Sequence, residues 1–219
     1  MSASDLDRAS KSGTDASAPI GRPTADRILD AAEALFAARG FAGTSVRDIA
    51  NAVGLNPASL YNHFANKEAL YEAVLERGIR PLVEMLEEAA KGETVEAETI
   101  ITAVMEHLAR TPQLPRLIHH EALSGGERLT EVVHNWVRPL LVPAMAAAAR
   151  KGDDTGWQPD ELAPLISAWL HMVFGHFAMA PILGELFGAD PLSPENLERQ
   201  TRFLRKASLR LMSEPIDPD

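Results

Sequence analysis

The sequence predicts an all-α protein, with four helices before Lys91, five after Gly92 and no strands. Apolar residues recur at three- and four-residue spacing along most of the chain, which places them on one face of a helix. Residues typical of helix ends lie between these stretches: glycines after apolar runs, and Ser or Asn before Pro or an acidic residue. No internal repeat is visible.

Length and composition limit the class of protein. With 219 residues the chain is long enough to bury a core, and the absence of cysteine excludes disulfides and thiolate metal sites. The most apolar stretch, residues 162–183, contains two histidines and two prolines, so a buried helix explains it better than a membrane span. The first twenty residues lack the apolar segment of a signal peptide. We therefore expect a soluble, cytoplasmic protein.

The net charge of −10 is distributed unevenly. Residues 1–80 hold 9 Lys and Arg against 10 Asp and Glu, whereas residues 81–219 hold 12 against 21. Because phosphate contacts need Lys and Arg, the acidic C-terminal part is not expected to bind DNA. DNA bound by the nearly neutral N-terminal part would be held by neutral donors and by dimerisation as much as by charge.

Helix-end signals define the N-terminal elements. Residues 1–22 are polar and of low complexity, and we expect a disordered tail. The first helix begins at Thr24 and ends before Gly40, which has the position of a residue that follows a helix C-terminus. Ser45 is then a helix N-cap, and Asp48 three residues later completes the pattern of a capping box. This predicts a second helix over residues 45–53.

A tight turn separates the second helix from a short third one. Gly54 supplies the turn, Asn56 caps the third helix, and Pro57 occupies its first position. A long fourth helix follows from Asn66, with a bend near Pro81. Two short helices joined by a tight turn are the layout of a helix-turn-helix, whose second helix lies in the major groove of DNA.

Small and polar side chains on the third helix predict contacts with bases and phosphates. Small residues at its start let the helix backbone approach the base edges, and Asn62 carries the amide that suits adenine. Lys67 lies at the start of the fourth helix, where free backbone N–H groups favour a phosphate. The predicted DNA-contacting set is Thr44, Ser45, Arg47, Pro57, Ala58, Ser59, Tyr61, Asn62, His63 and Lys67. The alternative for Tyr61 and His63 is a packing role.

Residues 24–70 resemble the DNA-binding domain of the TetR/AcrR (tetracycline-repressor) family of bacterial transcriptional regulators. The resemblance rests on Arg27–Ala32, Leu35-Phe36, Gly40-Phe41, Thr44–Ala50, Val53–Leu55, Leu60–Phe64 and Asn66–Leu70. Asn56-Pro57-Ala58 departs from the family pattern, which often has Ser, a basic residue and Gly there, so the contact made by that basic residue is not expected here.

The resemblance also implies an overall organisation. It implies an Ω-shaped homodimer of about nine helices, whose C-terminal domain binds a small molecule. Ligand entry would move the fourth helix and change the spacing of the two recognition helices. Most members of the family are repressors.

Beyond Gly92 the pattern predicts helices over residues 94–110, 112–123, 127–151, 160–186 and 193–213. Pro139 and Pro143 fall inside the third of these and should kink it, because each removes an intrahelical hydrogen bond. Ser193 followed by Pro194 is typical of a helix N-terminus.

Large apolar residues and histidines of the C-terminal part predict a small-molecule pocket. The predicted lining is Met105, His107, His120, His134, Trp136, Trp169, Met172 and Phe177. The alternative is that these residues form the core of the helical domain. A metal site is not expected. His119, His120 and Glu121 are adjacent on a helix and point in different directions, and His171 and His176 are five residues apart, a poor spacing for one metal ion.

The last two predicted helices carry more apolar residues than one subunit is expected to bury. They therefore predict a dimer with a four-helix bundle around its two-fold axis. The predicted interface is Leu165, Ala168, His176, Met179, Phe203, Leu204, Ala207 and Leu211.

Four segments are predicted: a disordered tail (1–22), a helix-turn-helix DNA-binding domain (23–70), a helical ligand-binding and dimerisation domain (71–213) and a second disordered tail (214–219). The predicted function is a repressor that binds a pseudo-palindromic operator in double-stranded DNA as a homodimer. A small-molecule effector, with a weak preference for an apolar or aromatic one, would release it. No cofactor and no membrane partner are expected.

Two alternatives are an activator of the same family and a helical metal- or ligand-binding protein that does not bind DNA. An enzyme is not expected, because the sequence has no phosphate loop, no Gly-x-Ser-x-Gly and no Cys.

Overall fold

The computed structural model of the protein describes residues 23–90, 97–139, 141–142, 158 and 160–213. Regular structure within these residues is helical throughout, which confirms the predicted fold class. The elements are α1 (Thr24–Arg39), α2 (Val46–Ala52), α3 (Pro57–Tyr61), α4 (Lys67–Ala90), α5 (Ala97–Arg110), α6 (Gln113–Leu123), α7 (Glu127–Val132), the π-helical η1 (Val133–Val137), α9 (Leu162–Ala178), α10 (Ala180–Phe187) and α11 (Pro194–Ser213). The predicted tails, residues 1–22 and 214–219, lie outside the described residues.

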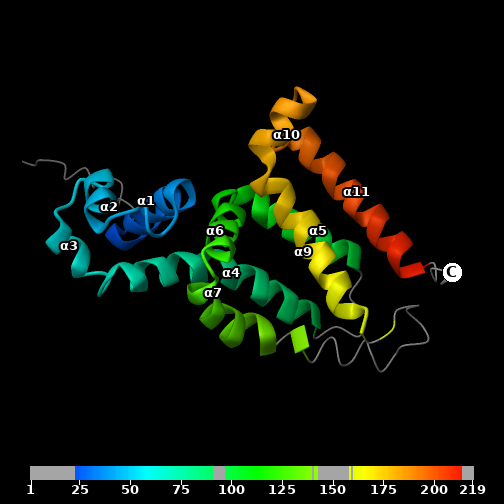
Figure 1. Cartoon of the computed structure of the whole chain (residues 1–219), viewed down its shortest axis with the longest axis horizontal. Helices are drawn as coiled ribbons and strands as arrows, with labels where there is room; N and C mark the ends of the chain where they lie inside the picture. Colours follow the sequence, from blue (N-terminus) through cyan, green and yellow to red (C-terminus); the bar gives the residue numbers. More distant parts are fainter. Residues whose placement is uncertain (1–22, 91–96, 140, 143–157, 159, 214–219) are drawn as a thin grey trace, which may run out of the picture.

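The first three helices form one end of the molecule, and α4 runs from them into the remaining helices (Figure 1). α1 packs against α2, α4 and α6, so the N-terminal helices touch the C-terminal part through α6 as well as through α4. α11 packs along α5, and α9 packs against α6. α4 is continuous across residue 70, the predicted domain boundary.

One buried cluster joins the two ends of the molecule. It includes Ile28 and Phe36 of α1, Leu75 of α4, Leu117 of α6 and Phe177 of α9, each with at most 1% of its surface exposed. Because these side chains come from both the N-terminal and the C-terminal helices, a shift of α6 changes packing around α1 directly.

The predicted helix over residues 160–186 is two helices, and in this respect the prediction was wrong. α9 ends at Ala178 and α10 begins at Ala180, with an angle of 71° between them. The cause is Pro181, which has no N–H to donate to the carbonyl four residues earlier and is tolerated only in the first turn of a new helix. No single helix of the described residues is long and apolar enough to cross a membrane, and α9 with α10 reaches that length only across the bend.

The irregularity predicted for residues 127–151 appears as a π-helical turn. Arg138 donates its backbone N–H to the carbonyl of Val133, five residues earlier, just before Pro139. A proline at this point removes the ordinary bond to the carbonyl of Asn135, and the wider turn is one way to accommodate that loss. Pro143 and residues 143–151 of the predicted helix lie outside the described residues.

Gly78 allows α4 and α6 to approach closely. A Cβ added at Gly78 would lie 2.7 Å from Cδ1 of Leu114, which is 1% exposed and has no room to move away. His107 of α5 reaches the same residue, with its Nε2 3.0 Å from the carbonyl oxygen of Gly78. Both α5 and α6 therefore contact α4 at Gly78.

Replacing Gly78 with alanine is expected to lower the free energy of unfolding by about 1–2 kcal/mol, because overpacking outweighs the gain in helix propensity. The matched control is Gly175→Ala in α9, where a Cβ meets nothing within 4 Å. That control should raise stability by about 0.5–1 kcal/mol. Urea unfolding of both variants checks this, and an equal gain in both would show that α4 and α6 are not in tight contact.

Candidate nucleic-acid interface

The start of α2 is fixed by the predicted capping box, which the structure confirms. The backbone N–H of Asp48 donates to Ser45 Oγ at 3.1 Å, and the backbone N–H of Ser45 donates to Asp48 Oδ2 at 3.0 Å. The hydrogen bonds from the side chain and backbone of Ser45 lower the pKa of Asp48 below its usual value. The carboxylate is therefore charged at neutral pH and closes the N-terminus of α2.

The turn between α2 and α3 sets the position of α3. Gly54 has a φ of +71°, which L-residues with a side chain rarely adopt. Asn56 Oδ1 then accepts the backbone N–H of Ser59 at 2.7 Å, and Pro57 takes the first helical position, both as predicted. The guanidinium of Arg27 ties the turn to α1, because its Nη2 donates to the carbonyl of Val53 at 2.8 Å.

Helix α3 is buried on one side and open on the other. Leu60 is fully buried, whereas half of the surface of Tyr61 is exposed. The exposed residues in and just after α3 are Ala58, Tyr61, Asn62 and His63, with Pro57 and Ser59 partly exposed. A short helix held at its N-terminus and presenting small and polar side chains to solvent has the shape and chemistry that major-groove reading needs.

Thr44 differs from the other predicted contact residues. Its side chain is 1% exposed, and its hydroxyl donates toward the carbonyls of Gly40 at 3.0 Å and Leu35 at 3.2 Å. These bonds hold the segment after α1 against the end of that helix. The hydroxyl therefore serves the fold, and the prediction that it is free to contact a phosphate is corrected. Ser45 and Arg47 next to it are exposed.

Lys67 lies at the N-terminus of α4 with its ammonium group over an aromatic ring. Its Nζ is 4.0 Å from the centroid of Phe41, an arrangement favourable for a cation–π interaction. Burial lowers the pKa of Lys67. Asn66 precedes the helix and caps it, because its Oδ1 accepts the backbone N–H of Ala69 at 2.7 Å. The cation is thus partly buried beside Phe41, at the N-terminus of α4.

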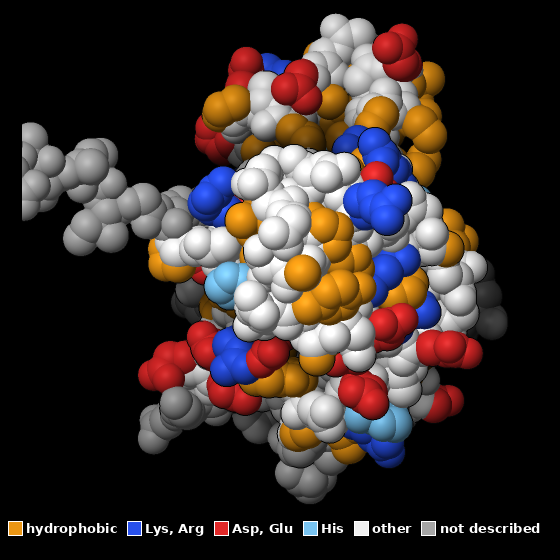
Figure 2. Space-filling model, turned by 90° about the vertical axis from the view of Figure 1, so that its left-hand side faces the viewer, with side chains coloured by type: hydrophobic (Ala, Val, Ile, Leu, Met, Phe, Trp, Pro, Cys, Tyr) orange, Lys and Arg blue, Asp and Glu red, His pale blue; other side chains and the backbone are white. Residues whose placement is uncertain are grey.

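Figure 2 shows the end of the molecule formed by α1–α3. The centre of this view is mostly uncharged, with Lys and Arg around its edge and Asp and Glu gathered above and below. This distribution agrees with the nearly balanced charge of residues 1–80, which hold 9 Lys and Arg against 10 Asp and Glu.

Comparison with known proteins identifies this end of the chain. The family model for bacterial regulatory proteins of the tetR family matches residues 28–74. The transcriptional repressor KstR2 of Rhodococcus jostii (strain RHA1) is 48% identical over 61 residues, which are 28% of this chain and 29% of KstR2. Residues 28–74 therefore carry the DNA-binding domain of the TetR family. The matching relatives are named transcriptional regulators rather than enzymes, and they support a DNA-binding regulator.

Two comparisons extend over most of the chain. YvkB, an uncharacterized transcriptional regulator of Bacillus subtilis (strain 168), is 25% identical over 167 residues, covering 75% of this chain and 86% of YvkB. The structure of Salmonella enterica GusR superposes with a TM-score of 0.60 and 26% identity, covering 90% of this chain and 98% of GusR. The fold shared with GusR therefore includes most of the C-terminal helices as well as the DNA-binding domain.

The residues predicted for the ligand pocket are not gathered in one cavity. Met105 and Phe177 are at most 2% exposed and belong to the core, as the alternative held. Trp136 packs under the guanidinium of Arg80, 4.1 Å from its Cζ to the ring centroid. Trp169 and Met172 are half-buried against the core. His107 contacts the carbonyl oxygen of Gly78 in α4, and His120 and His134 are exposed. No group of three or more His, Asp or Glu within the described residues is arranged to hold a metal ion.

Most of the predicted dimer residues lie on the exposed or partly exposed surface of α9, the α9–α10 bend and α11, and with the exposed side chains of α10 this surface is called the α9–α11 face. Exposed fractions of the large apolar side chains there are Leu170 51%, Met179 45%, Ile182 59%, Leu186 69%, Phe187 72% and Phe203 58%. Ala168 is exposed as well, and Leu165, His176 and Ala207 are partly exposed. Leu204 is fully buried against its own subunit, so its predicted place in an interface is corrected. The side chain of Leu211 lies outside the described residues.

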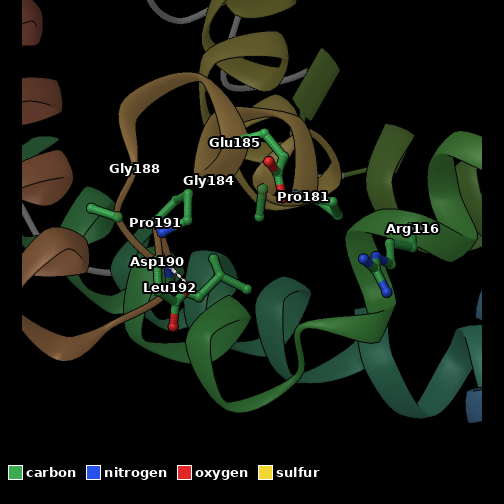
Figure 3. Close-up of a pocket in the computed structure, with 10 residues that line it drawn as sticks. Arg116, Pro181, Gly184, Glu185, Gly188, Asp190, Pro191 and Leu192 are labelled. Atoms are coloured by element: carbon green, nitrogen blue, oxygen red, sulfur yellow. Dashed lines mark hydrogen bonds between the residues drawn. The ribbon is translucent and has the colours of Figure 1, made fainter.

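Two pockets lie near this face. A groove of about 680 Å³ between α9, α10 and α11 is lined by Met172, Gly175, His176, Met179, Leu183, Phe187, Ala189, Pro191, Asn196, Arg199 and Gln200. A second pocket of about 460 Å³ lies between α6 and the α10–α11 segment (Figure 3). Arg116 of α6 borders it on one side, and Glu185 and Asp190 lie on the other. Sequence reasoning missed both, because neither draws its lining from one helical stripe.

His176 makes stability depend on pH. Its Nε2 lies 3.2 Å from the carbonyl oxygen of Pro191, and burial lowers the pKa of His176 below the ordinary value of 6.5. The unfolded chain therefore takes up a proton before the folded one does, so the free energy of unfolding falls as pH drops from about 6.5 toward the folded pKa. His176→Gln should lose less stability than the wild type between pH 7.5 and 5.5. Equal losses in urea unfolding would contradict this, and His171→Gln is the control.

Proposed function

We propose that this protein is a ligand-responsive repressor. It binds a pseudo-palindromic operator as a homodimer, with one α3 in each of two successive major grooves, and a small molecule bound among the C-terminal helices releases it. The observation on which this depends is the exposure of Tyr61, at the end of α3, and of Asn62 and His63 just after it, while Leu60 on the opposite side is buried.

Each exposed group has a role that suits its chemistry. The amide of Asn62 has the paired donor and acceptor that match adenine, and the methyl of Ala58 suits the thymine methyl. Tyr61 and His63 present polar ends to phosphate oxygens, and the exposed Arg47 suits a phosphate or a guanine edge. Lys67 adds a phosphate contact at the N-terminus of α4.

Dimerisation through α9, α10 and α11 follows from their exposed apolar side chains. Monomeric soluble proteins rarely leave so many large apolar residues together on one face. A second copy of the same face would cover them around a two-fold axis and place two helices from each subunit in one bundle. The two α3 helices would then have to lie about 34 Å apart to read one face of the duplex.

Release by an effector is a shift between two arrangements of the dimer. The effector must bind the arrangement that does not fit DNA more tightly than the one that does. α4 connects the two ends: Lys67 is at its DNA-facing terminus, and α5 and α6 are seated on it at Gly78. The Met and Trp content of the C-terminal helices supports an apolar or aromatic effector.

A repressor is favoured over an activator because KstR2, which is named a repressor, is the relative with 48% identity in the DNA-binding part. A reporter gene tests this. A genomic fragment selected by the purified protein is placed between a promoter and the reporter, with and without expression of the regulator. Lower reporter output with the regulator present is the expected result. Higher output would identify an activator, and unchanged output with a bound fragment would overturn regulation at that site.

A further inference from the structure

Two cations of different helices share the ring of Phe41. Lys67 Nζ of α4 is 4.0 Å from the ring centroid, and the guanidinium carbon of Arg128 in α7 is 3.7 Å from it. The two charged groups are therefore at most about 8 Å apart. The proximity of Arg128 contributes to lowering the pKa of Lys67, though less than burial does. Phe41 itself packs on Phe36 and Tyr71 in the core of the DNA-binding end.

A buried carboxylate fixes Arg128 in this place. Glu121 is 1% exposed, and its Oε1 accepts the backbone N–H of Arg128 at 2.9 Å and lies 3.8 Å from the guanidinium Nη1. Its Oε2 accepts the hydroxyl of Tyr71 at 3.2 Å. The N-terminus of α7 begins after Gly126 with no side-chain cap of its own, so the charge of Glu121 also favours the helix dipole there.

We infer that Arg128, held by Glu121, is a positioning residue that sets where Lys67 lies on the Phe41 ring and thereby how readily Lys67 reaches a DNA phosphate. This rests on the proposed DNA contact of Lys67. Arg128 belongs to α7 of the C-terminal part, outside the residues predicted to touch DNA, so it ties the phosphate-binding cation to the position of α6 and α7.

Because both cations contact the ring of Phe41, removing Arg128 should strengthen the contact between Lys67 and that ring. A ring face attracts each cation through its quadrupole, and two like charges near the same ring oppose one another. With Arg128 in place, Lys67 is bound to the ring less tightly and leaves it more easily for a phosphate. Without Arg128, Lys67 rests on Phe41 more firmly, and DNA binding has to break that contact.

A double-mutant cycle tests the coupling through DNA affinity. The intact full-length protein is titrated on a selected genomic fragment as wild type, Arg128→Gln, Lys67→Gln and the double variant. We expect Arg128→Gln to weaken binding about fivefold in the wild-type background and less than twofold when residue 67 is Gln. Arg110→Gln, which removes an exposed arginine from α5, is the control and should leave affinity unchanged.

A second cycle in Phe41→Leu separates the ring from direct repulsion between the cations. If the ring transmits the effect, Arg128→Gln has less than a twofold effect in Phe41→Leu; a persisting fivefold effect would overturn the inference. Equal losses from Arg128→Gln with Lys or Gln at position 67 would also overturn it, as would no loss at all. Melting curves confirm that each variant is folded. A folded wild type that binds no fragment would instead refute the proposed function, and the inference with it.

Discussion

Replacing Tyr61 and Lys67 together with alanine is expected to weaken operator binding by about 100-fold or more. Each substitution removes a contact in both subunits, and a hydrogen bond to a charged group contributes about 1.5–3 kcal/mol. Losing Lys67 from both subunits should also reduce the slope of log affinity against log salt by about 2. Fluorescence anisotropy at several salt concentrations measures both quantities.

The fold should survive these substitutions, which is what separates a DNA contact from a packing role. Tyr61 is half exposed, and the only ring contact of Lys67 among the described residues is the one with Phe41. We expect the free energy of unfolding to change by less than about 1 kcal/mol. Arg110→Ala with Thr130→Ala, both exposed and away from α3, is the matched control. Unchanged DNA affinity with a large loss of stability would assign Tyr61 and Lys67 to packing instead.

Replacing Phe36 with alanine is expected to lower the free energy of unfolding by about 3–5 kcal/mol. Phe36 is fully buried, stacks on Phe41 with ring centroids 5.9 Å apart and meets Tyr71 edge-on at 4.8 Å. The cavity would open where α1, α4 and α6 meet, so DNA affinity should fall as well. Urea unfolding measures the loss.

Leu123→Ala is the control for Phe36→Ala. Leu123 is 87% exposed at the end of α6, and its truncation should cost less than about 0.5 kcal/mol. A loss at Phe36 no larger than that would show that the three aromatic rings do not hold the DNA-binding end together.

The helix-turn-helix was predictable because its determinants are local. The capping box of Ser45 and Asp48, the turn at Gly54 and the cap at Asn56 each depend on residues within three or four positions of one another. Such short-range hydrogen bonds and backbone preferences are visible in sequence order. The exposure of α3 could be inferred in the same way from the spacing of its apolar residues.

Features that join distant segments were not predictable. Nothing near Thr44 in the sequence indicates that its hydroxyl donates to the carbonyl of Leu35, nine residues earlier in α1. The sequence indicates only that Glu121 is a polar residue of a helix. The fold brings its carboxylate to the hydroxyl of Tyr71, 50 residues earlier. Leu204 has the spacing of an interface residue, but α11 turns it toward α5 and its own core. In each case the deciding contact is made by tertiary packing.

The break between two helices at residues 178–180 could have been predicted from the sequence. Pro181 was visible inside the predicted span, and a proline in a helix interior ends or kinks it. The long apolar run around it favoured one continuous helix, whereas the structure starts a new one at Ala180. The bend also shapes the groove between α9, α10 and α11, which is why that groove could not be anticipated.

Titration of a genome-selected fragment with the wild-type protein shows most clearly whether two copies of α3 read one operator. We expect a pseudo-palindromic site, two protomers on each site with half-sites about one helical turn apart, and an affinity that falls steeply with salt. A folded dimer that enriches no fragment, or one that binds as a single protomer with no salt dependence, would contradict this expectation.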